Sequence, residues 1–468
     1  MGKFKPVSTD QLFLLPPSLE DFVPEGHLAR VVNDIVDTID VIAIEKKYSH
    51  LGQKSYHPHL MLKLLFYGYC TGVRSGRKIS TACGQDTAYM YLACMHKPDF
   101  RTLNDFRKDN LPFIHQCFSH IVQLCKHLGM AKAGTLILDG TKLRANASAT
   151  KSKSKEQYEN WLNRIENDIT DILNEAARND EAEDKLYGNK RGDELSKELH
   201  SKQKLKEKIK IALEQIKDDK QRINLTDNDA KYIKGKGGID TNYNCQAAIT
   251  EDGIIVGAYT SNNSSDRSET IRSVQVAEQT TKEEYINIVA DSGYASYNHF
   301  ETLHNCNKVI YMPDQAMLTD IENASNPYHR NHFVYDSEQN IFICPEKKDL
   351  SYFKKSSHKK TNTQSDVYIC RDCPSCDKQQ LCTKGKYRHI QVEKREWLRT
   401  QIRERLNTDE GKRMYKKRML IESVFGIIKH NLNYIKLHLR GVEKTTAEWQ
   451  LICIGYNLKK IHKLKLSW

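Results

Sequence analysis

The stretch "AGTLILDGTKLRANAS", residues 133–148, marks a change from helical to strand periodicity along this chain. Leu136, Ile137 and Leu138 form a continuous apolar run, as in a strand that is buried on both faces. The run leads into Asp139-Gly140, which is a turn sequence, so the simplest interpretation of Asp139 is a turn residue. We predict that this is the first strand of a sheet and that it ends at Asp139.

Residues 1–130, before this strand, are predicted to be mostly helical. "PEGHLARVVNDIVDTID" carries apolar residues at helical spacing, and "HPHLMLKLLFYGYCTGV" is a largely apolar helix. In "PDFRTLNDFRKDN", Thr102 and Asp105 have the spacing of a loose capping box. Short helices with basic tips suit DNA docking, and they suit an ordinary helical surface equally well. The basic residues concerned are Arg74, Arg77, Lys78, Arg101, Arg107 and Lys108.

Downstream of the first strand the pattern predicts a mixed α/β sheet with two insertions. From residue 241 the order is a hairpin that turns at Glu251-Asp252-Gly253, then helix, strand, helix and strand. Residues 151–225 have apolar residues at three- and four-residue steps on both sides of the turn "YGNKRGDE", which predicts a helical hairpin. Residues 315–390 form the second predicted insertion and contain a cysteine cluster.

Composition and charge narrow the class of protein. The 468 residues include 39% hydrophobic and 28% charged residues, with no apolar run of membrane-spanning length and no signal-peptide pattern in "MGKFKPVSTD". Most of the 13 cysteines are scattered among apolar residues, which favours reduced thiols in a cytoplasm. The net charge is +12, and from Lys384 onward 21 Lys and Arg face 8 Asp and Glu. A basic region of this kind predicts a polyanion partner, and a generally basic soluble protein is the alternative.

The basic region contains one isolated carboxylate, Glu422, in "YKKRMLIESVFGIIKH", residues 415–430. We predict one amphipathic helix here, with Tyr415, Arg418, Glu422 and Lys429 in a stripe about 60° wide. The apolar side would consist of Leu420, Ile421, Val424, Ile427 and Ile428. The alternative is a solvated face with an ordinary Arg–Glu pair four residues apart.

Three carboxylates suggest a metal site. Asp139 and Asp291 follow two predicted strands of one sheet, and Glu422 lies on a helix that we expect to pack across that sheet. Side chains so placed can converge on two divalent cations, which activate a water or a 3′-hydroxyl and stabilise the leaving oxygen of a phosphodiester. Carboxylate oxygens are the ligands that Mg²⁺ prefers. Asp266, in a polar loop, competes with Asp291 as the second acid, and we favour Asp291 because a strand end holds a ligand more firmly.

The spacing Tyr-(2)-Arg-(3)-Glu-(6)-Lys of the stripe resembles the signature of bacterial insertion-sequence transposases of the DDE class. Further similarity runs from about residue 10 to residue 460. The similar stretches are "LLPPSLEDFVPEGHL", "GVRSGRKI", "PDFRTLNDFR", "ILDGTKLRANAS", "KGKGGIDTNYNCQAAI", "ADSGYAS" and "EWQLICIGYNLKK". They resemble the subgroup with an InsH-like N-terminal domain, a DDE domain and a cysteine-bearing insertion.

The resemblance implies a fold and a site. A helical domain, 1–130, would bind the DNA ends, and a ribonuclease H-like (RNase H-like) catalytic domain, 131–468, would carry both insertions. Asp139, Asp291 and Glu422 would be the catalytic triad that binds Mg²⁺ or Mn²⁺. Arg418 and Lys429 would hold DNA phosphates near the scissile bond, and Tyr415 would pack on the DNA near the cleaved end.

The expected activity is DNA transposition. The protein would bind terminal inverted repeats of double-stranded DNA, cleave at the element ends and join the 3′-OH ends to target DNA. It would act as a homodimer in a cytoplasmic, nucleoid-associated complex, with no membrane partner. Two alternatives remain: an RNase H-like nuclease without strand transfer, and an inactive DNA-binding protein derived from a transposase.

The cysteine cluster predicts a structural zinc site, with a set of reduced thiols as the alternative. Five cysteines are available where tetrahedral Zn²⁺ needs four, so one is spare. We assign Cys344, Cys373, Cys376 and Cys382 as the ligands. A closed site of four thiolates leaves no open position for chemistry, so its role would be structural or DNA-contacting.

Overall fold

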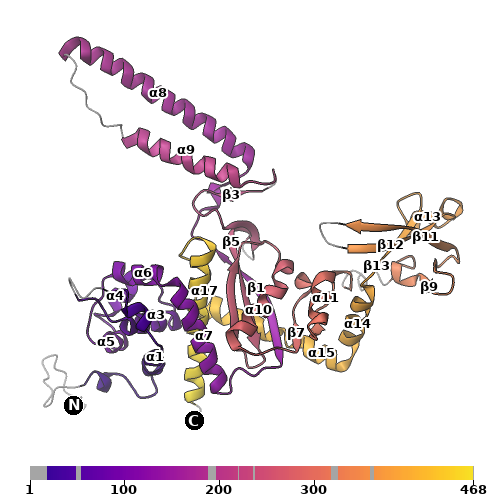
Figure 1. The fold of residues 1–468 in the computed structure, drawn as a ribbon, viewed down its shortest axis with the longest axis horizontal. Helices are drawn as coiled ribbons and strands as arrows, with labels where there is room; N and C mark the ends of the chain where they lie inside the picture. Colours follow the sequence, from indigo (N-terminus) through magenta and orange to yellow (C-terminus); the bar gives the residue numbers. More distant parts are fainter. Residues whose placement is uncertain are drawn as a thin grey trace, which may run out of the picture. The chain divides into compact units, whose positions relative to one another are not determined.

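The computed structural model describes residues 18–48, 54–187, 197–219, 221–235, 238–317, 325–358 and 363–466. The chain divides into a helical unit and an α/β unit, whose elements are labelled in Figure 1. The helical unit consists of Met1–Leu128, Ile427–Tyr434 and Ala447–Trp468. The α/β unit consists of Gly129–Gly426 and Ile435–Thr446. The start "MGKFKPVSTD", used for the signal-peptide prediction, lies outside the described residues.

The helical unit is built around α3, an almost entirely buried helix. The predicted helices of this region form, but the predicted capping box is wrong: Asp99 caps α6, and its carboxylate accepts a hydrogen bond from the backbone N–H of Arg101. Thr102 and Asp105 lie inside that helix because it begins at Phe100. The elements are η1 (Leu19–Phe22), α1 (Leu28–Asp37), α2 (Ile42–Glu45), α3 (Pro58–Cys70), α4 (Gly76–Ala82), α5 (Thr87–Leu92), α6 (Phe100–Asp109), α7 (Leu111–His127), the π-helical segment η7 (Ile427–Asn431) and most of α17 (Val442–Lys465).

The last helix packs closely on α3 within this unit. A Cβ at Gly455 of α17 would lie 2.7 Å from the carbonyl oxygen of Tyr69, so only glycine allows this approach. The hydroxyl of Tyr434 donates a 2.8 Å hydrogen bond to the same carbonyl. Residues distant in sequence therefore complete the helical core.

The α/β unit contains a six-stranded mixed sheet. Its strands are β1 (Thr135–Arg144), β4 (Lys231–Gly235), β5 (Gly238–Thr250), β6 (Ile255–Ser261), β7 (Asn287–Val289) and β8 (Val309–Tyr311). Strand β5 pairs antiparallel with β1, β4 and β6, while β7 runs parallel to both β1 and β8. The predicted hairpin at Glu251-Asp252-Gly253 joins β5 to β6, as expected.

The prediction that the first strand ends at Asp139 is wrong. β1 continues through Asp139-Gly140 to Arg144 because the long antiparallel neighbour β5 supplies partners along its whole length. On the other side, the parallel pairing with β7 ends at Ile137↔Val289. Asp139 therefore lies where one neighbouring strand stops and the other continues.

Helices follow the strands in the predicted order. In the α/β unit these are η3 (Asp266–Glu269), α10 (Thr270–Thr281), η4 (Ser292–Tyr294), α11 (Tyr297–Asn305), α14 (Glu396–Asn407), α15 (Asp409–Lys416) and α16 (Met419–Gly426). Helix α10 contacts β5, β6 and β1, and α16 also contacts β1. A Cβ at Gly257 of β6 would lie 3.3 Å from the backbone nitrogen of Ala277, which shows how closely α10 lies on the sheet.

Two helices lie within the predicted hairpin segment 151–225. They are α8 (Lys155–Tyr187) and α9 (Lys197–Gln215), which contact each other over a small core that includes Tyr158, Ile165 and Ile209. The short strands β2 (Ser152–Lys153) and β3 (Ile223–Asn224), with η2 (Ala149–Lys151), lie at the base of the pair. The predicted turn "YGNKRGDE" lies, from residue 188 on, outside the described residues.

A second sheet of five strands lies in the described part of segment 315–390, and its last strand extends to Glu393. Its order is β13-β12-β11-β10-β9, and all neighbouring pairs are antiparallel. The elements are η5 (Arg330–His332), β9 (Val334–Asp336), β10 (Ile341–Ile343), β11 (Asp349–His358), β12 (Thr363–Cys370), η6 (Cys373–Ser375), α13 (Gln379–Cys382) and β13 (Arg388–Glu393). Residues 318–324 and 359–362 of the predicted insertion lie outside the described residues.

The prediction of one continuous helix over residues 415–430 is also wrong. Helix α15 ends at Lys416 and α16 begins at Met419, because backbone bonds to the third residue back replace the α-helical pattern here, as in Arg418 N–H to Tyr415 C=O at 3.0 Å. The apolar face is narrower than predicted, since Leu420 and Ile427 are more than one-third exposed.

Candidate functional site

Two of the three predicted acids lie on neighbouring parallel strands. β1 and β7 pair as far as Ile137↔Val289, and Asp139 and Asp291 each lie two residues beyond that pair, so both acids follow the same end of the parallel pairing. Asp291 follows β7 and caps η4, where its carboxylate accepts a 2.8 Å hydrogen bond from Gly293 N–H. The Asp139 carboxylate accepts a hydrogen bond of the same length from Gly140 N–H. Both carboxylates are therefore held by the backbone next to them.

The third acid is connected to the other two through Arg418. The guanidinium of Arg418 forms an ion pair with Glu422 at 2.7 Å, across the turn that joins α15 to α16. The same guanidinium interacts electrostatically with Asp139 and Asp291. Tyr415 also hydrogen bonds to Arg418. The structure thus brings Tyr415, Arg418 and all three acids into one neighbourhood, although Tyr415 and Glu422 lie on different helices.

Burial disfavours the charged forms of two of the acids, Asp139 and Asp291. Burial raises the pKa of Asp139 to about 7, and the Asp291 carboxylate adds to this increase, whereas the Gly140 N–H and Arg418 oppose it. Burial also raises the pKa of Asp291, with a further contribution from Asp266. Burial alone would lower the pKa of Arg418, but its anionic neighbours raise it. A cluster of carboxylates whose pKa values rise together is a site that favours bound positive charge.

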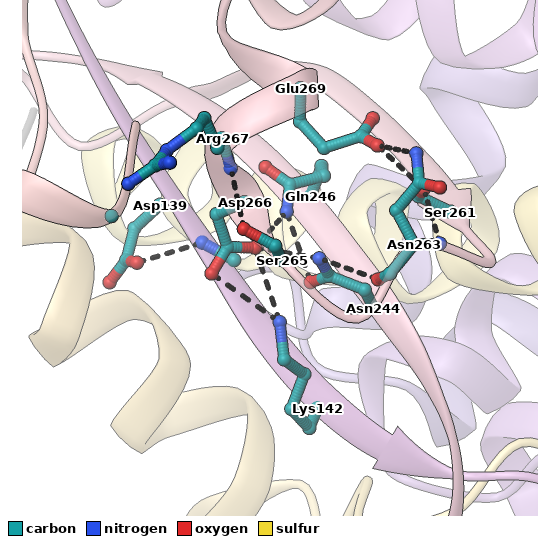
Figure 2. Close-up of polar contacts among 12 residues, drawn as sticks. Asp139, Lys142, Asn244, Gln246, Ser261, Asn263, Ser265, Asp266, Arg267 and Glu269 are labelled. Atoms are coloured by element: carbon teal, nitrogen blue, oxygen red, sulfur yellow. Dashed lines mark hydrogen bonds and ion pairs between the residues drawn. The ribbon is translucent and has the colours of Figure 1, made fainter. Parts of the chain in front are cut away.

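Asp266, the competing acid, is the centre of a polar network (Figure 2), and it also interacts electrostatically with Asp139 and Asp291. Its carboxylate accepts hydrogen bonds from Asn244 Nδ2 at 2.6 Å and Gln246 Nε2 at 2.7 Å, and it forms a 3.1 Å ion pair with Lys142 Nζ. The nearby Glu269 is 1% exposed and accepts from Ser261 Oγ at 2.7 Å. This network fixes the loop between β6 and α10.

The network lies on one face of the sheet. A Cβ at Gly140 would lie 2.6 Å from Asp266 Oδ1, so Asp266 is on the face toward which residue 140 points. Successive strand residues point to opposite faces, so Asp139 points to the other face. The carboxylate of Asp266 is also already bound by an ammonium group. Both observations favour Asp291 over Asp266 as the partner of Asp139.

The donor set of the three acids fits a hard divalent cation. Oxygen-only ligands on rigid elements suit Mg²⁺ or Mn²⁺. Within the described parts of the chain, no three Asp, Glu, His or Cys side chains already have a metal-binding arrangement. Glu422 is instead ion-paired with Arg418.

The five clustered cysteines line one small cavity of about 20 Å³, which is the space of a single water or ion. Cys344 Sγ accepts a hydrogen bond from Lys348 N–H at 3.1 Å, and Cys373 Sγ accepts one from Arg388 N–H at 3.3 Å. Such backbone N–H donors stabilise negative charge on sulfur. Burial raises the pKa of Cys370 to about 12, with the Cys373 side chain contributing, and burial also raises the pKa of Cys382.

Lys429, the last residue of the predicted stripe, lies in η7 and belongs to the helical unit. Its role in phosphate binding stays a prediction. Sequence reasoning missed the network residues Lys142, Asn244 and Gln246. A signal was present, because Asn244 and Gln246 alternate along an otherwise apolar strand and therefore share a face.

The basic residues of the helical unit differ in exposure. Arg107 is 7% exposed and donates a 3.1 Å hydrogen bond to the hydroxyl of Tyr69, so it is a structural residue. Arg77 and Arg101 are exposed, and their guanidinium groups lie 4.7 and 5.6 Å from the ring centroid of Phe100. These two arginines, like the exposed Lys78 and Lys108, are accessible to an external ligand.

Two family models match separate segments of the chain. Residues 17–109 match a transposase domain (DUF772), and residues 343–462 match a transposase DDE domain. These matches support a transposase of the DDE class found in insertion sequences, as the sequence motifs predicted. The second segment contains Glu422, whereas Asp139 and Asp291 lie outside both segments.

No protein matches the chain in a search of curated sequences. Among the described residues, no helix combines the length and apolar character needed to cross a membrane.

Proposed function

We propose that this protein is a DNA transposase that binds the terminal inverted repeats of an insertion sequence, cleaves phosphodiester bonds at the element ends and transfers the 3′-OH ends to target DNA. The observation that carries the proposal is the position of Arg418, which interacts with Asp139, Asp291 and Glu422 from three separate elements. The two transposase family matches provide the reaction class.

The strand arrangement supports an RNase H-like fold for the catalytic domain. Three antiparallel strands, β6, β5 and β1, are followed by the parallel strands β7 and β8, and β1 is central. The first acid lies on the central strand, and the second follows its parallel neighbour. We infer that the domain covers 131–468, and that 151–225 and 315–390 are insertions in it.

Asp139, Asp291 and Glu422 would hold the divalent cations. Bound there, Mg²⁺ or Mn²⁺ would lower the pKa of an attacking water or 3′-hydroxyl and stabilise the leaving oxygen. The chain itself supplies rigid carboxylates, a charge-balancing arginine and an aromatic side chain. The guanidinium of Arg418 would hold a DNA phosphate, and Tyr415 beside it would pack against the DNA.

The helical unit would bind the DNA ends, with Arg77 and Arg101 as candidate phosphate contacts. Because an element has two ends, the active complex would be a homodimer or larger. The cluster of Cys344, Cys373, Cys376 and Cys382 would hold a structural Zn²⁺ that folds the second sheet.

The test is a joining reaction. Purified protein, Mg²⁺, a labelled duplex carrying the element end and an unlabelled plasmid should yield plasmid that carries the label, and Asp139→Asn should bind the end without cleaving it. Label that is cut but never joined would identify a nuclease. End binding without any cleavage by the wild-type chain would identify a non-catalytic DNA-binding protein. Either result would overturn the proposal.

A further inference from the structure

The short helix η4, which follows the second acid, is held to the sheet through one tyrosine. Asp291 caps η4, and the backbone N–H of Tyr294 donates a 3.2 Å hydrogen bond to the carbonyl of Asp291. The carbonyl of Tyr294 accepts hydrogen bonds from Thr270 Oγ1 at 2.9 Å and from His299 Nδ1 at 3.1 Å. The position of Asp291 therefore depends on how Tyr294 is held.

The hydroxyl of Tyr294 reaches a glutamine on β5. It donates a 2.5 Å hydrogen bond to Gln246 Oε1, and both side chains are 0% exposed. Strand β1 lies between β5 and β7 in the sheet, because β5 pairs with one edge of β1 and β7 pairs with the other. The hydrogen bond thus joins the segment after β7 to β5 across the central strand. We call it the Tyr294–Gln246 bridge.

A glycine of the central strand makes room for the Tyr294–Gln246 bridge. Gly140 of β1 lies directly opposite Gln246 in the strand register. A Cβ at Gly140 would clash with Gln246 Nε2, so the glutamine could not keep its position beside any other residue. Gly140 follows Asp139 directly, and Tyr294 is three residues after Asp291. The bridge therefore passes next to the first acid and ends close to the second.

The amide of Gln246 has one orientation. Its Nε2 donates to Asp266 Oδ1 at 2.7 Å and to Asn244 Oδ1 at 3.0 Å, and Figure 2 shows these three side chains together. An amide NH₂ group offers two donors, and a carboxylate only accepts, so the amide nitrogen must face Asp266. The amide oxygen is thereby directed to the Tyr294 hydroxyl. The polar network around Asp266 thus also fixes the bridge.

We propose that Gln246 and Tyr294 are positioning residues, which hold Asp291 where it can share a divalent cation with Asp139. The inference rests on the proposed function for the role of the two acids. The two carboxylates repel each other, so the surrounding structure must fix their separation. Ligands that orient a metal ion must themselves be held by hydrogen bonds from the groups behind them. Both positioning residues are completely buried, so neither can contact DNA.

The experiment measures Mn²⁺ binding to the full-length chain without DNA, so that cleavage plays no part. Isothermal titration calorimetry gives the dissociation constant, and Asp139→Asn identifies the part of the signal that belongs to the acids. Tyr294→Phe removes only the hydroxyl of the bridge. We expect it to weaken Mn²⁺ binding by about 10–100-fold, which is the usual cost of changing a group that orients a metal ligand.

Tyr243→Phe is the matched control. Tyr243 also lies on the buried part of β5 and is 0% exposed, but its hydroxyl donates a 2.7 Å hydrogen bond to Asp227. This variant should lower the thermal midpoint about as much as Tyr294→Phe does and should keep the Mn²⁺ affinity of the wild type. A lower midpoint with unchanged Mn²⁺ affinity in Tyr294→Phe, or an equal loss of affinity in both variants, would overturn the proposal.

A second variant tests the Tyr294–Gln246 bridge from its other end. Gln246→Met removes the acceptor at similar volume and should also weaken Mn²⁺ binding. Because both substitutions break the same hydrogen bond, the loss of affinity in the double variant should be smaller than the product of the two single losses. Independent losses that multiply would overturn the proposal, as would wild-type Mn²⁺ binding that does not depend on Asp139. Joining of labelled DNA judges the proposed transposase activity separately, so its failure would not produce any of these results.

Discussion

The two candidate metal sites of the α/β unit differ in how the chain assembles them. The four predicted zinc ligands come from one short region, residues 344–382, and two of them are the ends of a single turn. The acids come from β1, the end of β7 and α16, which are far apart in sequence. The cysteine site can thus be built from turns between residues close in sequence. The acid site depends on strand pairing, which brings residues far apart in sequence together.

The chemistry of the two sites differs in the same way. In the cysteine site, backbone N–H groups already point at sulfur, as in Lys348 to Cys344. In the acid site, the Arg418 guanidinium supplies the positive charge instead, and the carboxylates repel one another. We therefore expect the first site to contribute to stability and the second to reduce it.

The strongest test of this contrast concerns the second acid. Asp291→Asn should lower the single-turnover rate of DNA cleavage by more than about 100-fold, because even changes in the outer shell of a metal site cost 10–100-fold. Asp266→Asn should cost much less, since Asp266 lies on the other face of the sheet and is bound by Lys142. If Asp266→Asn were inactive and Asp291→Asn active, Asp266 rather than Asp291 would be the second acid.

The cysteine site is tested by metal content. Cys373→Ser should reduce bound zinc in the purified protein from one per chain to none, and it should lower the thermal midpoint because the second sheet loses its ligand. Cys370→Ser is the matched control and should keep one zinc, because the proposed ligand set does not include Cys370. Wild-type protein without zinc, or loss of zinc in both variants, would contradict the assignment.

A smaller effect should follow from changing the backbone next to the first acid. A Cβ at Gly140 would lie against Gln246 and within 2.6 Å of Asp266 Oδ1, so Gly140→Ala should disrupt the polar network and cost about 1–3 kcal/mol of unfolding free energy. Gly426→Ala is the control, because nothing lies within 4 Å of a Cβ there. Urea unfolding measures the free energy of unfolding of both variants. Equal values would show that the polar network accommodates the added methyl group without loss of stability.

A dependence of stability on pH should follow from the burial of the first acid. The pKa of Asp139, about 7 in the folded protein, exceeds the value of about 3.9 for an unfolded chain, so the folded state binds the proton more tightly. Stability from this group is complete below about pH 4 and is lost as the pH rises toward 7. Metal-free Asp139→Asn should therefore have a higher thermal midpoint than the wild type at pH 8, and the two should converge near pH 4. A lower midpoint for the variant at pH 8 would contradict the repulsion described here.

Much of the fold followed from residue patterns. The helices of residues 1–130, the hairpin at Glu251-Asp252-Gly253 and the two helices within 151–225 were predictable because their apolar periodicity and turn residues are local signals. The cysteine spacing and the Tyr-Arg-Glu-Lys stripe likewise identified candidate site residues from sequence, and the transposase class is supported by the family matches.

Other features required the folded chain. The continuation of β1 past Asp139 depends on β5, a strand about a hundred residues downstream, and no local signal reports that pairing. Between α15 and α16, hydrogen bonds to the third residue back replace the α-helical hydrogen bonds to the fourth, although the composition of this segment suits a helix. The position of Asp266 on the opposite face, in contact with Lys142, depends on the register between β1 and β5.

The candidate site residues could be proposed from the chain alone, since acid, thiol and basic side chains at set spacings are properties of its sequence. Only the folded molecule shows which of those acids share a face of the sheet. It also shows which positively charged group lies near them. The cause is a difference in range. Periodicity and turn residues are signals within a few consecutive residues. The pairing of β1 with β7, and the position of Arg418 near Asp139 and Asp291, join segments far apart along the chain.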